Sequence, residues 1–116
     1  MHDNDATPAF RELIRVLEGA VQAGVNTIGL EYKGRDLMVF HCVGPMGLGA
    51  ARIDQELQQA VIEEIVQRAG LARKSKGRMQ VKLLGKDHEV AVEEYDSFGE
   101  SAFNLTLKER SKKAAR

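Results

Sequence analysis

The sequence predicts an α+β fold, a two-layer domain in which an antiparallel β-sheet carries two main helices on one face. Its 116 residues are the length of a single domain. Two stretches place apolar residues at helical spacing, and five others alternate between apolar and polar residues with short turns between them. Strands joined by short turns pair antiparallel, which leaves one sheet face free for helices. The expected element order is α-β-β-α-β-β-β.

The first helix is expected to begin at Pro8 and to end before Gly24. Thr7 can cap it, and proline suits the first helical position because its missing N–H is not needed there. Glycine is common directly after a helix. The apolar stripe consists of Phe10, Leu13, Ile14, Leu17, Ala20 and Val21.

A β-hairpin should follow this helix. Residues 25–32 alternate in polarity, residues 33–36 contain a glycine and read as a turn, and residues 37–43 form the returning strand. The next stretch, residues 44–49, holds three glycines and a proline, and we expect it to be a loop.

A second helix is expected from Asp54, a candidate N-cap, to about Ala69, with Gly70 closing it. Basic and polar residues at 72–77 predict a linker. The next stretch again predicts paired strands, so a helix followed by a hairpin occurs twice in the chain. The two copies share little residue identity. The expected strands are residues 78–84, 89–95 and 102–107, with turns at 85–88 and 96–101.

Composition limits the functions that are plausible. Hydrophobic residues make up 43% of the chain and charged residues 29%, which is ordinary for a folded domain. The formal net charge is zero, which argues against nucleic-acid binding and makes self-association plausible.

From the predicted helices and strands we expect a disordered lead at residues 1–7, one domain at 8–107, and a basic tail at 108–116.

The compartment predicted by the sequence is the cytoplasm. Cys42 is a single cysteine, so no internal disulfide can form, and in a strand it should be a buried small apolar residue. The chain contains no run of about 20 apolar residues. Its first five residues are polar and acidic, unlike a signal peptide, so we expect no membrane insertion.

The glycine-rich stretch is the most suggestive feature for ligand binding. Gly44, Gly47 and Gly49 lie between a predicted strand and a predicted helix, where backbone amides can hold a phosphate. Their spacing matches neither the dinucleotide fingerprint nor the phosphate-binding loop of nucleotide hydrolases. Two interpretations remain open, a flexible connection and a small-ligand site.

The remaining polar residues predict no enzyme, no metal site and no cofactor. His2, His41 and His88 are scattered, and His41 and Cys42 should point to opposite faces of one strand. The acidic run Glu93-Glu94-Tyr95-Asp96 alternates between faces and reads as solvated surface. No serine lies in a G-x-S-x-G turn.

Six short stretches occur in an order and spacing that resemble a known bacterial family. They are Gly24–Glu31, Met38–Gly44, Glu56–Val61, Ala69–Leu71, Lys76–Arg78 and Phe98–Glu100. With the amphipathic first helix, residues 10–107 resemble the N-terminal domain that precedes the motor domain in the assembly ATPases of type II secretion and type IV pili. The resemblance implies a PAS-like fold and protein–protein contacts within such machines.

The polar network of that family is mostly replaced here. Its strand arginines, which face nucleotide, correspond to Val39 and His41, while Arg78 is the charged position that still matches. The resemblance therefore implies a non-catalytic interaction module, without an ATPase domain, that binds a secretion or pilus motor component or another copy of itself. The alternative is a sensor of a nucleotide or metabolite, with Gly44, Gly47, Gly49 and Arg78 as its ligand-binding residues.

Overall fold

The structure is a computed structural model, and it describes residues 7–110. Its elements are α1 (Pro8–Gln22), β1 (Thr27–Lys33), β2 (Asp36–Val43), β3 (Met46–Arg52), the short 3₁₀ helix η2 (Gln55–Leu57), α2 (Gln58–Ala69), β4 (Lys76–Leu83), β5 (Lys86–Ser97) and β6 (Glu100–Glu109). Within the described chain, the two main helices were both predicted, and so were five of the six strands.

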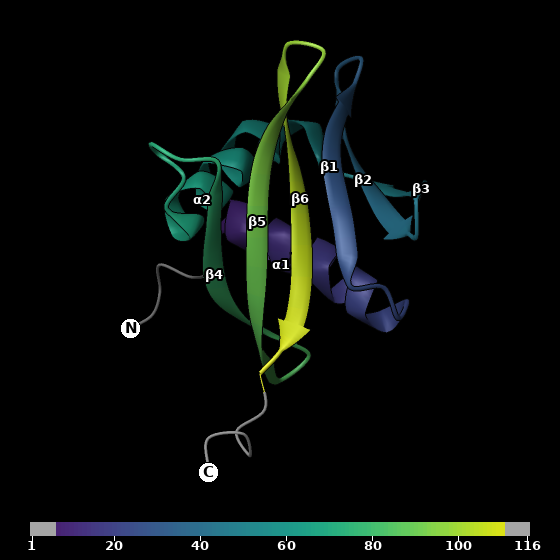
Figure 1. The fold of residues 1–116 in the computed structure, drawn as a ribbon, viewed down its shortest axis with the longest axis vertical. Helices are drawn as coiled ribbons and strands as arrows, with labels where there is room; N and C mark the ends of the chain where they lie inside the picture. Colours follow the sequence, from purple (N-terminus) through teal and green to yellow (C-terminus); the bar gives the residue numbers. More distant parts are fainter. Residues whose placement is uncertain (1–6, 111–116) are drawn as a thin grey trace.

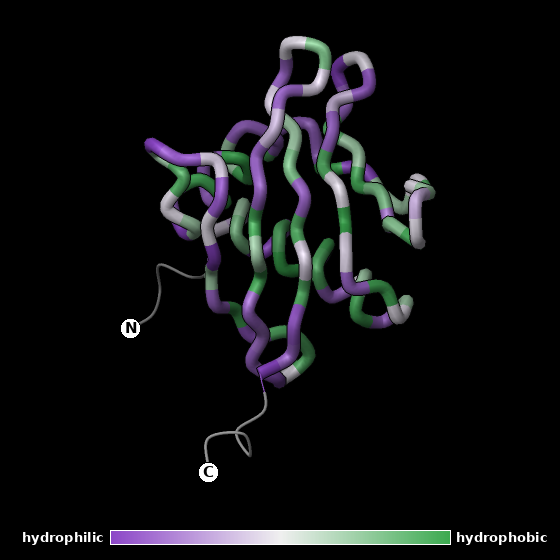
Figure 2. The backbone as a smooth tube through the Cα atoms, viewed as in Figure 1, coloured by the Kyte–Doolittle hydropathy of each residue, from purple (hydrophilic) through white to green (hydrophobic). Residues whose placement is uncertain are grey.

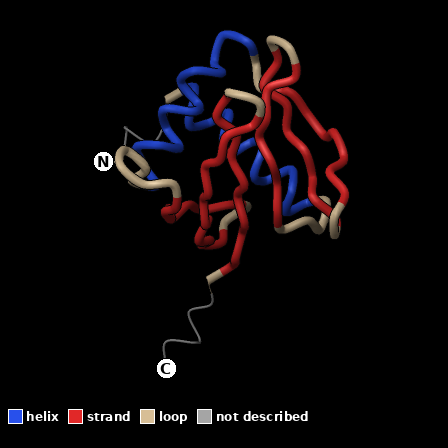
Figure 3. The backbone as a smooth tube through the Cα atoms, turned by 45° about the horizontal axis from the view of Figure 1, so that its top comes forward, coloured by secondary structure: helices blue, strands red, loops and turns tan. Residues whose placement is uncertain are grey.

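One antiparallel sheet contains all six strands, in the order β3-β2-β1-β6-β5-β4. Both helices lie on the same side of it, behind the strands in Figure 1 and again on one side in the turned view of Figure 3. The α+β, two-layer, antiparallel arrangement is therefore confirmed. The first strand pairs with the last, so β1 and β6 form the seam that joins the two halves of the chain.

The prediction of a loop at residues 44–49 is wrong. Gly44, with φ of +58°, and Pro45 form a tight turn, and the chain then returns as β3. The observed order is therefore α-β-β-β-α-β-β-β. Glycine and proline dominate this stretch and have low strand propensity, so its composition does not predict a strand.

The predicted hairpins are confirmed, but their turns are shorter than expected. Ser97 pairs with Glu100, so only Phe98 and Gly99 remain in the turn between β5 and β6. β4 begins at Lys76, inside the predicted linker. β6 continues to Glu109, so the predicted basic tail begins within a strand. Thr7 caps α1 as predicted; the rest of the predicted lead, residues 1–6, and residues 111–116 lie outside the described chain.

The two helix–meander units are not a structural repeat. Their strands follow the same spatial order, 3-2-1 and 6-5-4, but the antiparallel alternation makes β1 and β4 run in opposite directions. A rotation that reverses strand direction while keeping the helices on one face would also reverse the spatial order. No rotation therefore superposes one unit on the other.

The core lies between the helices and the sheet. Leu13 and Leu17 of α1, and Val61 and Ile65 of α2, are fully buried against inward-facing strand residues such as Phe103. Figure 2 shows hydrophobic and hydrophilic residues alternating along the strands, as expected for a sheet with one covered face. The helix stripe predicted from the sequence is displaced, because Phe10 and Ile14 are only partly buried and lie at the edge of the core.

Candidate interaction surfaces

The structure separates the residues predicted to bind a ligand. Gly44, Gly47 and Gly49 lie on the β2–β3 hairpin, at one edge of the sheet. Arg78 lies on β4, the opposite edge strand, where its guanidinium is 3.4 Å from a carboxylate oxygen of Glu89. The four predicted residues therefore do not form one site.

Gly47 and Gly49 instead make room for an aromatic side chain. They stand on the sheet face away from the helices, opposite Cys42 and Phe40. A Cβ atom at Gly47 would lie 3.7 Å from the Cβ of Phe40, and one at Gly49 would lie 4.0 Å from its ring. The Phe40 side chain thus covers the glycines of β3, which is a known way to stabilise a glycine-rich edge strand.

The hairpin of β2 and β3 exposes a group of large apolar side chains at this edge of the sheet. Val43, Met46 and Leu48 are 53%, 59% and 49% exposed, respectively. Met46 is opposite Val43 and Leu48 is opposite His41, so they project from the face that carries the helices. The helix layer therefore does not extend far enough to cover this part of the sheet.

The two edges of the sheet differ in charge. Along β4 the side chains of Lys76, Arg78 and Lys82 alternate with inward-facing apolar residues, and such charges keep an edge from pairing with other strands. Along β3 the first six residues carry no charge, and Arg52 at its end is the first ionised side chain. Among the described strands, β3 is therefore the edge without this protection.

A β-bulge limits the part of β3 that can pair regularly. The register with β2 shifts between Val39 and Phe40, so Ala50 has no direct partner. Bulges increase the local twist of an edge and end regular pairing. Residues 46–49 remain as an extended, uncharged segment whose outward backbone groups are free of partners in the sheet.

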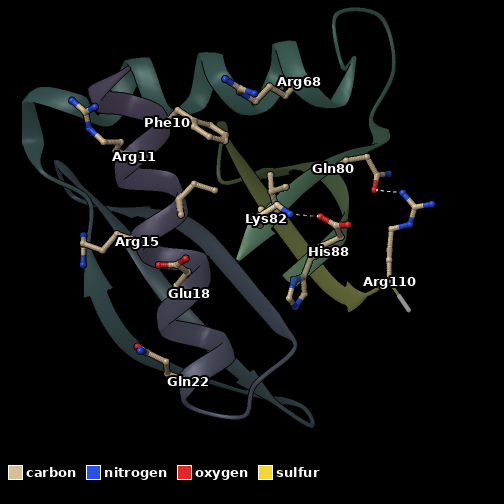
Figure 4. Close-up of a pocket in the computed structure, with 13 residues that line it drawn as sticks. Phe10, Arg11, Arg15, Glu18, Gln22, Arg68, Gln80, Lys82, His88 and Arg110 are labelled. Atoms are coloured by element: carbon tan, nitrogen blue, oxygen red, sulfur yellow. Dashed lines mark hydrogen bonds and ion pairs between the residues drawn. The ribbon is translucent and has the colours of Figure 1, made fainter. Parts of the chain in front are cut away.

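A groove of about 930 Å³ lies at the other edge, between α1 and β4 (Figure 4). Three partly or fully buried apolar side chains, Phe10, Ile14 and Val81, line it. The end of β6 and the start of β5 also contribute, through Arg110 and His88. The groove thus combines an apolar floor with polar side chains from both layers.

Cationic side chains dominate the polar lining of this groove. They are Arg11, Arg15, Arg68, Lys82 and Arg110, against the two carboxylates Glu18 and Asp87. The whole chain has zero net charge, so the excess of cations in this groove reflects how the fold distributes the charges over the surface. Arg11 and Arg15 are four residues apart, so the sequence places them on one face of a helix, but it does not place β4 beside that face.

Several of these cations are held in defined positions. Arg15 makes a bidentate ion pair with Glu12, with distances of 3.0 and 2.7 Å, and this hydrogen bonding holds the pKa of Glu12 below its ordinary value. Arg68 lies 3.7 Å above the Phe10 ring and 2.6 Å from Glu64. Arg110 donates a 2.9 Å hydrogen bond to the side chain of Gln80. Packing and pairing therefore fix the wall of the groove before any ligand binds.

His88 is buried at the side of the groove and has a defined tautomer. The ring nitrogen Nδ1 lies 3.0 Å from the carbonyl oxygen of Lys86. A carbonyl oxygen can only accept, so Nδ1 carries the proton in the neutral ring and Nε2 is left as an acceptor.

A polar contact that the sequence did not predict lies on the outer face of the sheet. The Tyr95 hydroxyl donates a 2.6 Å hydrogen bond to Glu31, which is 64 residues away in the chain. Partial burial, then the hydrogen bond and the negative charge of Glu31, raise the pKa of Tyr95 to about 12. The sequence predicts a solvated surface for the acidic run at 93–96, whereas its tyrosine forms a cross-sheet contact.

Other chemical groups are sparse in the described chain. Cys42 is half-buried on the outer face and not fully buried as expected. Within residues 7–110, no three side chains of His, Cys, Asp or Glu are grouped as a metal site would require. The helices in the same range are too short and too polar to cross a membrane.

Comparison with known proteins gives no assignment. No protein-family model matches the chain, and none of the curated proteins compared with it matches either.

Proposed function

We propose that the protein is a non-catalytic interaction module that associates with a second copy of itself through β3. The observation that carries this proposal is the uncharged edge segment at residues 46–49, within which Met46 and Leu48 are about half exposed. Unpaired edge strands bind other strands through their free backbone groups, and the apolar side chains add burial. The opposite edge, β4, carries charges that disfavour the same contact.

A second copy is the partner that suits β3 best. Antiparallel pairing of two identical strands about a two-fold axis makes every contact twice and closes after two subunits. It also places the two Arg52 side chains at opposite ends of the new pair, whereas parallel pairing would bring these like charges together. The zero net charge of the chain keeps long-range repulsion between copies small.

Kinship with the N-terminal domains of secretion and pilus ATPases, with a PAS-like fold, remains part of the proposal. The amphipathic α1 followed by an antiparallel sheet, and the Ala69-Gly70-Leu71 end of α2, support it. Strand β3 is not anticipated by that resemblance. In such a setting the same edge would present a docking strand to a motor component, so a heterologous strand is the competing occupant of β3.

Sedimentation velocity over a range of concentrations tests the proposal. We expect the wild-type chain to form a dimer, and Leu48→Lys to be monomeric because the added ammonium would be buried and unpaired at the interface. Leu48 is half exposed, so the variant should fold, and a thermal melt checks this.

Gln80→Lys is the matched control, because it adds the same charge to an exposed position on the other edge strand. This variant should dimerise like the wild type. A wild-type chain that stays monomeric at all concentrations, or a Leu48→Lys variant that still dimerises, would contradict self-association through β3.

A further inference from the structure

The groove between α1 and β4 is elongated. Its lining runs along α1 from Phe10 to Gln22, which at 1.5 Å per residue is about 18 Å of helix. An extended chain rises about 3.3 Å per residue, so a segment of about six residues would span it. A single small ion would touch only a few of the side chains distributed over this length.

One wall of the groove is an edge strand. Gln80, Val81 and Lys82 of β4 line it, and β4 has a strand neighbour on one side only. Because α1 crosses the strands obliquely and only three residues of β4 line the groove, part of an extended segment can pair its backbone with β4, as in peptide recognition by strand addition, while the rest follows α1 over the floor. The apolar floor of Phe10, Ile14 and Val81 provides room for apolar side chains.

The charges select the chemistry of that segment. Five cationic side chains line the groove against two carboxylates. Three of the five, Arg15, Arg68 and Lys82, already form ion pairs, so the excess positive charge comes from Arg11 and Arg110. Arg11 is exposed and has no ion-pair partner among residues 7–110, so its guanidinium can bind a carboxylate directly. A basic segment, including β4 of a second copy, would be repelled.

From these three features we infer that the groove binds an acidic, extended peptide segment of a partner protein, with apolar residues alternating between its carboxylates. The inference concerns a different edge from β3 and does not depend on dimerisation. The groove would thus give the module a second, heterologous contact, while β3 joins identical copies.

The test is fluorescence anisotropy with labelled synthetic peptides. The probe alternates glutamate and leucine over about eight residues, enough to exceed the groove, and a matched probe has lysine in place of each glutamate. We expect affinity for the glutamate probe to be about tenfold or more above that for the lysine probe, and to fall as salt is added.

Variants locate the binding site. Arg11→Glu should weaken binding of the glutamate probe about tenfold, whereas Arg35→Glu, the same change at an exposed turn outside the groove, should change it by less than about twofold. Glu18→Gln should strengthen binding, because its amide oxygen can still accept the 2.8 Å hydrogen bond from the Leu84 N–H while one negative charge is removed.

Amide chemical shifts provide an independent readout. Titration with the glutamate probe should shift the resonances of Gln80, Val81 and Lys82 and leave those of β3 unchanged, also in the Leu48→Lys variant. Equal affinity for the two probes, equal effects of Arg11→Glu and Arg35→Glu, or shifts confined to β3 would overturn the inference. So would binding to phosphatidylserine vesicles without binding to the glutamate probe, because a lipid surface would then be the ligand.

Discussion

The hydroxyl of Tyr95 donates a 2.6 Å hydrogen bond to Oε2 of Glu31, and this bond crosses the strand that separates them in the sheet. Between them lies Ala102 of β6, which pairs with Tyr95 and is fully buried. The bond spans the seam where β1 and β6 pair at only four positions, compared with ten between β5 and β6. It therefore ties the N-terminal and C-terminal halves of the sheet together.

Removing this hydroxyl should weaken the seam. Tyr95→Phe is expected to lower the free energy of unfolding by about 1 kcal/mol, because a hydrogen bond to a carboxylate is lost at a partly buried site. Urea denaturation followed by circular dichroism measures this change. Tyr32→Phe is the control, since Tyr32 is also half-buried but makes no side-chain hydrogen bond within the described chain, and its effect should be smaller.

Alkaline pH should act on the same contact. The pKa of Tyr95 is raised to about 12 in the folded chain, while an unfolded tyrosine titrates near about 10. The neutral hydroxyl is the form that the fold favours, so its contribution is complete below about pH 10 and is lost as the pH rises toward 12.

The absorbance of tyrosinate near 295 nm reports this titration, and the chain has only two tyrosines. A component that titrates at about 12 should disappear in Tyr95→Phe. If the wild type and this variant lost stability identically between pH 10 and 12, the hydrogen bond would not be the cause.

Two glycines should respond in opposite ways to the same substitution. A Cβ atom at Gly77 would collide with the backbone carbonyl oxygen of Ala69, where α2 closely approaches β4. Gly77→Ala is therefore expected to destabilise the fold by about 3 kcal/mol. Gly19 lies within α1 with open space around it, and Gly19→Ala should stabilise by up to about 1 kcal/mol. Thermal melts of both variants measure these shifts.

The turn between β5 and β6 should become more stable when Phe98 is replaced by a residue that favours this type of turn. Phe98 is fully exposed at its tip, with φ of +53°, and Gly99 follows with φ of +87°. Two central residues with positive φ form the tight hairpin turn that favours Asn-Gly. Phe98→Asn should raise the free energy of unfolding by about 1 kcal/mol, and a lower melting temperature would contradict this reading of the turn.

The sequence predicts the helices and strands better than it predicts which of them lie next to one another. Helical periodicity located α1 and α2, and alternation with turn residues located five strands, because these signals are local. Strand β3 was not predicted because the packing of Phe40 beside Gly47 and Gly49 is a contact between strands, which glycine content does not reveal.

These local patterns do not predict which distant segments pair with one another. Nothing local indicates that β1 pairs with β6, and this pairing decides that β3 and β4 become the two edges. The groove depends on α1 meeting β4, about 70 residues later in the chain, so Arg11 and Lys82 could not be assigned to one surface from their positions. The helical stripe likewise predicts Phe10 and Ile14 as core residues, although they line this groove.

The central claim, pairing of β3 with a second copy, predicts a specific geometry. Directly opposite residues in an antiparallel pair share a face. A two-fold axis that keeps all helices on one face must therefore lie midway between the two copies of a single residue of β3, and we expect that residue to be Gly47 or Leu48, the middle of the regular segment. At that position the same residue of both copies would be close enough for a disulfide, and one or two residues away the separation increases quickly.

Single-cysteine cross-linking is the most direct measurement. In a Cys42→Ser background, cysteine is introduced in turn at Met46, Gly47, Leu48 and Gly49, and disulfide-linked dimers are quantified after mild oxidation. Both glycines accept a Cβ atom with ordinary contacts, so the variants should fold. We predict one strong maximum, at position 47 or 48, and little cross-linking at 46 and 49. Equal cross-linking at all four positions, as parallel pairing would give, or none at any of them, would contradict the account.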